Sequence, residues 1–422
     1  MRRRLAALVL CALLVLTGCL QSGIIEDRND VRQLDDEPVK TVVVWHTYSD
    51  EETRVFEEQV IPAFQKEHPE IRIQSVRQAS NQEYLGALMT RAAADKTPDV
   101  IRLDYAWVPR FASRGLLLPL DQFPDYGTAA KPLREHMLES NRVGDRVFGL
   151  PLNITTKAAI FNRRLLGDAV PRSLMEVVEL ARERHYVIGM SGLDMWGSLP
   201  YFFGLGGKLS DERFTTTSGY LNSEASIYAV ETLLKLFREG LLNPHMLDGK
   251  GDLWKDVRTD SRVLMIDEGP WYYSILLNSA NRDADVLQTT VPAPFPSLGL
   301  YGSVIGGESL VLTKGTKVKE EAWTFIRWMM GKETQATMFK AGLIPTNTEA
   351  LQEPIGASAD NPYIAPYLEG IDQAFYRPAI PQWNEIEQLY KDALERIFIE
   401  GEDVKTALNE ASSAIDARLA GQ

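Results

Sequence analysis

The chain has 422 residues with 45 basic and 58 acidic side chains, which gives a formal net charge of −13. Its length is sufficient for two domains of ordinary size, and its 45% hydrophobic content is typical of a globular body rather than a disordered chain. A charge this negative argues against binding of nucleic acid or anionic lipid through the general field of the protein.

The N-terminus has the pattern of a secretory signal. Three arginines precede an apolar run over residues 5–16, which is too short to span a membrane, and Thr17-Gly18-Cys19 follows. The cysteine after Thr-Gly resembles the end of a bacterial lipoprotein signal, which implies that residues 1–18 are removed and that Cys19 carries a lipid. The alternative is an ordinary cleaved signal. We expect a protein anchored by lipid to the extracytoplasmic face of the cell membrane.

The remaining chain has a charge of about −16, because residues 1–18 contain three arginines and no acidic residue. Cys11 and Cys19 are the two cysteines of the sequence, so the body after Cys19 has neither a disulfide nor a cysteine metal site. Residues 19–40 are polar and charged, which is typical of a flexible tether.

The body begins with alternating strand and helix patterns. Strands are predicted at 42–45, at 71–73 and from 98, and helices at about 50–68 and 84–94. This order is typical of a doubly wound α/β domain. Further helices are predicted at 223–239, at 320–330 and from 385 onward, and a strand at 303–312.

Three interruptions of this pattern divide the chain into two lobes. They are the Gly- and Pro-containing segments 148–151, 292–296 and 342–346. We assign residues 41–150 and 300–345 to lobe I, and residues 151–299 and 346–422 to lobe II. A chain that crosses three times between two α/β lobes predicts a multi-strand hinge that lets the lobes open and close.

Catalytic motifs are missing. The five histidines have no metal-binding spacing, and Gly189-Met190-Ser191-Gly192 lacks the final glycine of a nucleophile elbow. Asp267 and Glu268 are adjacent acids, which usually point apart. We expect no catalytic residue, no metal and no cofactor.

Tryptophans beside turns are the main binding signal. Trp254, Trp323 and Trp328 are interpreted as packing residues, whereas five others lie at strand ends or in loops: Trp45, Trp107, Trp196, Trp271 and Trp383. Aromatic rings in loops suit stacking on the apolar faces of sugar rings. Packing in the core or at its rim is the alternative for any one of them.

The chain from Val42 to the C-terminus resembles the family 1 extracellular solute-binding proteins, the maltose- and multiple-sugar-binding lipoproteins of ATP-binding-cassette importers. The matching segments, in order, are Val44-Trp45-His46, Ile61-Pro62-Ala63-Phe64, Pro98-Asp99-Val100, Asp104, Gly149-Leu150-Pro151, Gly219-Tyr220-Leu221-Asn222-Ser223, Glu268-Gly269-Pro270-Trp271, Gly306-Gly307-Glu308, Ile344-Pro345-Thr346 and Arg377-Pro378. The resemblance implies two α/β lobes of the type II periplasmic-binding-protein kind, which close on a sugar.

The resemblance also implies which residues bind the ligand. Trp271 matches a sugar-stacking aromatic, and Asp104 lies where a carboxylate binds hydroxyls. The small residues of Gly306-Gly307 would let the sugar approach the backbone. Maltodextrin itself is doubtful, because the acid expected near Asn153 has no match. With Trp196 from its loop position, the predicted ligand-binding residues are His46, Tyr48, Asp104, Asn153, Trp196, Trp271, Gly306, Gly307 and Trp383.

The predicted function is that of a non-enzymatic receptor, which captures a mono- or oligosaccharide and delivers it to the membrane permease subunits of an ATP-binding-cassette importer. We expect a monomer. One alternative is the same fold with another polar solute such as glycerol phosphate, which would need arginines or a helix N-terminus in the cleft. The other is a surface carbohydrate-active enzyme, which would need two well-placed carboxylates.

Overall fold

The computed structural model describes residues 38–79, 82–94, 96–259, 261–278, 283–299, 301–351 and 361–421. The predicted signal, the lipidation site Cys19 and most of the predicted tether lie outside these ranges. The fold below is that of the unit Val39–Gln422. Within the described ranges, no helix combines the length and apolar character needed to cross a bilayer.

The first sheet starts as predicted. Strand β1 (Lys40–His46) pairs in parallel with β2 (Ile71–Arg77) and with β3 (Val100–Asp104). Helical segments α1 (Asp50–Val55), η1 (Phe56–Val60) and α2 (Ile61–Glu67) connect β1 to β2, and α3 (Gln82–Ala93) leads to β3. The helix start at α1 is stabilised by a capping box, in which the side chains of Ser49 and Glu52 each accept a hydrogen bond from the other's backbone N–H.

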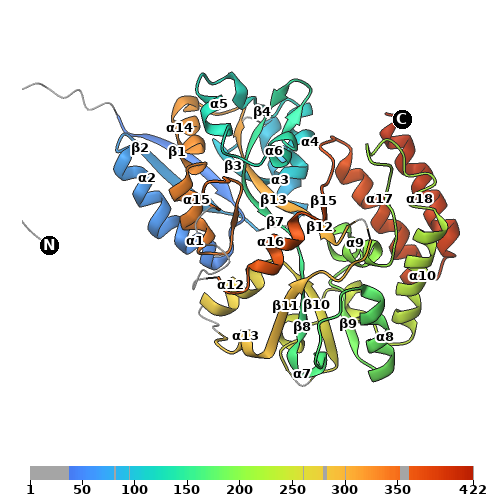
Figure 1. The fold of residues 1–422 in the computed structure, drawn as a ribbon. Coiled ribbons are helices and arrows are strands. Elements are labelled where there is room, and N and C mark those ends of the chain that lie inside the picture. Colours follow the sequence, from blue (N-terminus) through green and yellow to red (C-terminus); the bar gives the residue numbers. More distant parts are fainter. Residues whose placement is uncertain are drawn as a thin grey trace, which may run out of the picture. The chain divides into compact units, whose positions relative to one another are not determined.

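Later parts of the chain complete this sheet in antiparallel orientation. Strand β13 (Gly306–Thr313) lies between β3 and β7 (Gly149–Thr155), and β14 (Ile344–Pro345) pairs with β7. The order of the main path is β14-β7-β13-β3-β1-β2, and β4 (Leu117–Leu118) pairs with β13. Figure 1 shows β13 beside the earlier strands β3 and β7. The sheet is therefore mixed rather than purely parallel.

The predicted interruption at 148–151 is wrong, because these residues continue into β7. All seven residues of β7 are buried. Gly149 is needed for packing rather than for a turn, since a Cβ there would collide with the side chain of Asn141. The chain leaves the first sheet only after Thr155, at residues 156–157, where strand β8 (Ala158–Asn162) follows at once.

The second sheet has the order β11-β8-β10-β9, with β9 (Val187–Gly189), β10 (Val263–Glu268) and β11 (Thr290–Pro294). β10 is parallel to β9, and β8 is antiparallel to both of its neighbours. The proline-rich segment predicted as a connection is largely strand β11. Prolines are tolerated there because β11 lies at the edge of the sheet and pairs on one side only.

Two short strands and the last helices complete the described chain. β12 (Ser303–Val304) pairs in parallel with β15 (Ala374–Phe375). α17 (Trp383–Glu395) and α18 (Val404–Leu419) form the predicted helical tail and lie beside α10 (Glu224–Arg238) in Figure 1. The predicted helix at 223–239 is thus confirmed, as is that at 320–330 by α14 (Lys319–Met329).

The other elements have these bounds: η2 (Tyr105–Trp107), α4 (Val108–Ser113), η3 (Leu120–Gln122), α5 (Tyr126–Ala130), α6 (Glu135–Glu139), β5 (Arg142–Val143), β6 (Arg146–Val147), α7 (Arg163–Leu166), α8 (Leu174–Arg184), α9 (Met195–Gly204), η4 (Pro244–Leu247), α11 (Leu253–Asp256), α12 (Trp271–Asn278), α13 (Val286–Thr289), α15 (Lys332–Phe339), α16 (Ala365–Ile371) and η6 (Arg396–Glu400). One large apolar core surrounds the second sheet, and another packs between the first sheet and helices α2 and α14.

Candidate functional site

A cavity of about 650 Å³ lies where strands of the first sheet meet the start of α12. It is lined by residues that directly follow β1 and β2 and by others from β3, β7 and β13. Open α/β sheets bind ligands beyond the carboxyl ends of their parallel strands, and this cavity has that position. The lining residues with the most distinctive chemistry are Tyr48, Glu52, Arg102, Asn153, Trp271 and Glu308.

A buried arginine organises the polar part of the cavity. One Nη of Arg102 donates to Glu308 Oε2 at 2.6 Å and to Asn153 Oδ1 at 3.2 Å. The amide of Asn153 donates in turn to the same Glu308 oxygen at 2.8 Å. The guanidinium of Arg102 lies 4.4 Å from the centre of the Tyr48 ring, and only 4% of the Arg102 side chain is exposed. The hydrogen bonds and the ring hold these four side chains in one arrangement.

Glu52 adds a second carboxyl to this group. Burial raises the pKa of Glu52 above its ordinary value, although Arg102 and the hydrogen bonds from Ser49 act in the opposite direction. Burial also raises the pKa of Tyr48, so its phenol stays protonated and can donate a hydrogen bond. The cavity thus offers both donors and acceptors.

Two stacked tryptophans, one of which lines the cavity, come from α9 and α12. Trp271, the first residue of α12, lines the cavity, and its ring centre lies 6.1 Å from that of Trp196 on α9 with an angle of 27° between the planes. Glycines make room for both indoles. A Cβ on Gly269 would collide with the Trp271 ring, and one on Gly306 would lie 3.0 Å from the Trp196 ring.

His46 lies behind the cavity rather than in it. It is fully buried, Nε2 lies 2.8 Å from Ser75 Oγ, and the backbone N–H of Tyr48 donates to Nδ1 at 3.3 Å. The ring also packs on Tyr48 and Phe56. This histidine is among the predicted ligand-binding residues. The structure instead gives it the role of supporting Tyr48, because β1 directs the side chain of its last residue into the core.

Burial, with smaller contributions from Arg102 and Arg77, lowers the pKa of His46 from 6.5 to about 3. Between these pH values the unfolded chain takes up a proton that the folded protein does not, so stability must fall as the pH falls. We expect this histidine to cost about 2 kcal/mol of unfolding free energy between pH 6.5 and pH 5. Urea unfolding at several pH values should show a smaller loss in His46→Asn than in the native protein. Equal losses in the two would show that His46 is not responsible.

Two other predicted site residues, Asp104 and Trp383, do not line this cavity. Asp104 caps η2 and accepts hydrogen bonds from Arg377 at 2.9 and 3.0 Å. Trp383 is fully buried at the start of α17 and packs on Phe214 and Phe375, so its ring is not available for stacking on a ligand.

The two glycines at the start of β13 also have neighbours other than the expected ligand. Gly306 faces the Trp196 ring. Gly307 has a φ of +141°, and a Cβ there would collide with the backbone of Asn153 in β7. Both positions need glycine because of close contacts within the protein. The predicted site residues that do line the cavity are Tyr48, Asn153 and Trp271.

Residues 59–365 match the family of bacterial extracellular solute-binding proteins, which is well over half of the chain. The chain belongs to this family. Membership of it means a solute-binding protein rather than an enzyme, acting outside the cytoplasm. The resemblance noted from the sequence is thereby confirmed.

Individual relatives agree with this family. The maltodextrin-binding protein MdxE of Bacillus subtilis is 22% identical over 400 residues, which cover 90% of this chain and 89% of the relative. The maltotriose-binding protein of Pyrococcus abyssi is 22% identical over 374 residues, covering 85% of this chain and 77% of the relative.

Solved structures show the same fold. The GacH receptor of Streptomyces glaucescens, a structure solved both unliganded and with acarbose, superposes with a TM-score of 0.78 at 25% identity and covers 91% of this chain and 99% of its own. Maltose-bound MalE3 of T. maritima has a TM-score of 0.76 at 19% identity, and the match covers 89% of this chain and 98% of MalE3. The predicted α/β fold of the type II periplasmic-binding-protein kind is confirmed.

Sequence reasoning did not select the polar core of this candidate site. Arg102, Glu308 and Glu52 were not among the predicted ligand-binding residues. A signal was present for one of them: Arg102 lies in β3 between the apolar residues Ile101 and Leu103, and a charged residue buried in a strand needs a partner. In the described part of the chain, no cluster of His, Cys, Asp and Glu has the geometry to hold a metal ion.

Proposed function

We propose that this protein binds a neutral mono- or oligosaccharide in the 650 Å³ cavity. The observation that carries the proposal is that one cavity is lined both by the indole of Trp271 and by the connected polar side chains of Arg102, Asn153 and Glu308. Sugar rings have apolar faces, on which aromatic rings stack, and hydroxyls at their edges, which need donors and acceptors. We propose Tyr48, Asn153 and Trp271 as ligand contacts, with Trp196 supporting Trp271.

The charges of the cavity favour a neutral ligand over glycerol phosphate. Among the described residues, the arginines that line the cavity are already paired: Arg102 with Glu308, and Arg77 with Asp50. A phosphate would have to displace a carboxylate from one of these arginines and would then meet Glu52 and Glu308. A sugar can use the same groups without adding a charge.

The relatives support a sugar as the ligand. They include maltodextrin-, maltotriose- and galactooligosaccharide-binding proteins, and solved structures of the same fold contain acarbose and maltose. By the same family relation, we propose delivery of the sugar to permease subunits of an ATP-binding-cassette importer.

Thermal unfolding with a panel of neutral sugars and with glycerol 3-phosphate tests the ligand class, because a ligand that binds only the folded state raises the melting temperature. Analysis of the same mixtures for cleavage products tests the enzymatic alternative. We expect stabilisation by one or more sugars and no product. Stabilisation by glycerol 3-phosphate alone, or by no compound, would contradict a sugar-binding function.

We further propose that a lipid on Cys19 anchors the protein, as a monomer, to the membrane. The support for the anchor is the Thr-Gly-Cys segment that follows the apolar run. Cys19→Ala should release the protein from washed membranes and leave sugar affinity unchanged, since residues 19–40 separate the lipid from the folded body. Fractionation followed by calorimetry measures both effects. Retention of the variant after a salt wash would contradict the anchor.

A further inference from the structure

A buried lysine lies where the chain passes from the first sheet to the second. Lys157 stands between β7 and β8, and its side chain is 1% exposed. Its backbone N–H donates to Ser303 Oγ at 3.2 Å, and Thr156 Oγ1 donates to the carbonyl of Val304 at 3.1 Å. The two segments that connect the sheets here, residues 156–157 and 303–305, are thus bonded to each other.

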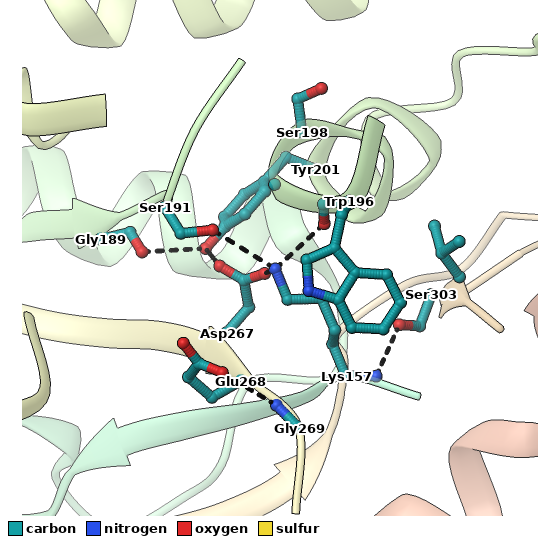
Figure 2. A network of polar contacts seen from close by, with 12 residues as sticks. Lys157, Gly189, Ser191, Trp196, Ser198, Tyr201, Asp267, Glu268, Gly269 and Ser303 are labelled. Carbon is teal, nitrogen blue, oxygen red and sulfur yellow. Dashed lines mark hydrogen bonds and ion pairs between the residues drawn. The ribbon is translucent and has the colours of Figure 1, made fainter. Parts of the chain in front are cut away.

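The ammonium of this lysine lies between β10 and the start of α9. It forms an ion pair with Asp267, donates to the backbone carbonyl of Trp196 at 3.0 Å, and lies 3.4 Å from Ser191 Oγ. It also lies 5.4 Å from the centre of the Trp196 ring. Figure 2 shows the lysine tip among these groups, with the indole of Trp196 next to its chain.

Asp267 is held from the other side. Tyr201 OH donates to Asp267 Oδ1 at 2.7 Å, and the Asp267 side chain is fully buried. Asp267 lies in β10, and the strand leads through Glu268 and Gly269 into the turn before Trp271. The lysine therefore contacts both segments that carry the stacked tryptophans: α9 through the Trp196 carbonyl, and the end of β10 through Asp267.

Fold stability alone does not account for this ion pair. Buried ion pairs often stabilise a protein less than apolar side chains of similar volume would. Burial raises the pKa of Asp267 to about 6, although Lys157 and Tyr201 both lower it. Desolvation thus outweighs the attraction to the lysine. Apolar side chains could not replace one feature of this pair. The ammonium of Lys157 donates a hydrogen bond to the Trp196 carbonyl, which fixes the position of that backbone segment.

We propose that Lys157 is a positioning residue, which fixes the Trp196–Trp271 pair relative to the connection between the sheets. The effect of Lys157 on affinity rests on the proposed sugar-binding function. The effect of Lys157 on the geometry of the two indoles is independent of that function.

The paired variant K157M/D267L tests this inference, because it removes both charges and leaves neither unpaired. Near-UV circular dichroism of the ligand-free protein reports the contact between the two indoles, and Trp196→Phe provides the spectrum without that contact. We expect the paired variant to unfold near the native melting temperature, to have a spectrum close to that of Trp196→Phe, and to bind the best sugar of the panel about tenfold more weakly.

A native spectrum together with native affinity in the folded paired variant would overturn the inference. If the native protein binds no sugar of the panel, the proposed function fails, and the spectrum alone still decides whether Lys157 positions the indoles. If the paired variant does not fold, Lys157→Met at pH 5 replaces it, since Asp267 is then protonated and leaves no unpaired charge. A native spectrum in that variant would equally overturn the inference.

Discussion

Replacing Trp271 with alanine is expected to weaken sugar binding about thirtyfold, which corresponds to about 2 kcal/mol. Trp271 is an aromatic residue at the start of α12 that lines the cavity, and its ring is held by Trp196 on one side and by the bare Cα of Gly269 on another. An indole that is already fixed loses little conformational freedom when a ligand stacks on it. Isothermal titration calorimetry with the best sugar of the panel measures the change.

Trp323→Ala is the matched control. Trp323 stacks on Phe123 with 4.5 Å between ring centres, donates from Nε1 to Asp125 at 2.7 Å, and is 4% exposed in the core against the first sheet. Its removal should lower the free energy of unfolding by about 3–5 kcal/mol and leave the affinity of the folded protein unchanged. If Trp271→Ala instead bound sugar normally, or lost stability as this control does, Trp271 would be a packing residue.

Replacing Arg102 with methionine is expected to lower the free energy of unfolding by about 3–5 kcal/mol, because it leaves the carboxyls of Glu308 and Glu52 partly buried without their cation. The amide of Asn153 also loses one of its fixed neighbours, so sugar affinity should fall as well. Urea unfolding at pH 7 measures the stability, and calorimetry on the folded variant measures the affinity.

Arg77→Met is the comparison for this experiment, since Arg77 lines the same cavity. Its side chain is 45% exposed and pairs with Asp50, which is 82% exposed, so we expect a loss of less than about 1 kcal/mol. If Arg102→Met and Arg77→Met lost similar amounts of unfolding free energy, the burial of the Arg102–Glu308 pair would add nothing specific to stability.

Local patterns were sufficient for the N-terminal part of the first sheet and its helices. The β-branched run at Val42–Val44, the apolar spacing of Phe56, Val60 and Phe64, and the alternation of Ile71 and Ile73 each depend on neighbours in the sequence, and the structure has β1, the helical segment from α1 to α2, and β2 at these positions. The family was also readable from the sequence, because the order of many short motifs is preserved along the chain.

Segments with glycine and proline were harder to interpret, because these residues have more than one structural use. Gly149-Leu150-Pro151 was predicted as a break between lobes and is buried strand, since Gly149 is required by the nearby Asn141 side chain. Pro292 and Pro294 were predicted in a connection and lie in an edge strand, where their missing N–H is not needed. Only the neighbours in space distinguish these cases.

The sequence by itself determined the alternation of strands and helices and the membership of a solute-binding family, and it selected Trp271, which lines the cavity. The tertiary structure alone decided the polar half of the site. Arg102 and Glu308 are separated by 206 positions, and they meet because β13 inserts antiparallel beside β3. The tertiary structure also buries His46 and Trp383 in the core. It brings Lys157, which follows β7, into an ion pair with Asp267 of β10. Strand register and the burial of charges depend on contacts between distant segments, which no local pattern of residues encodes.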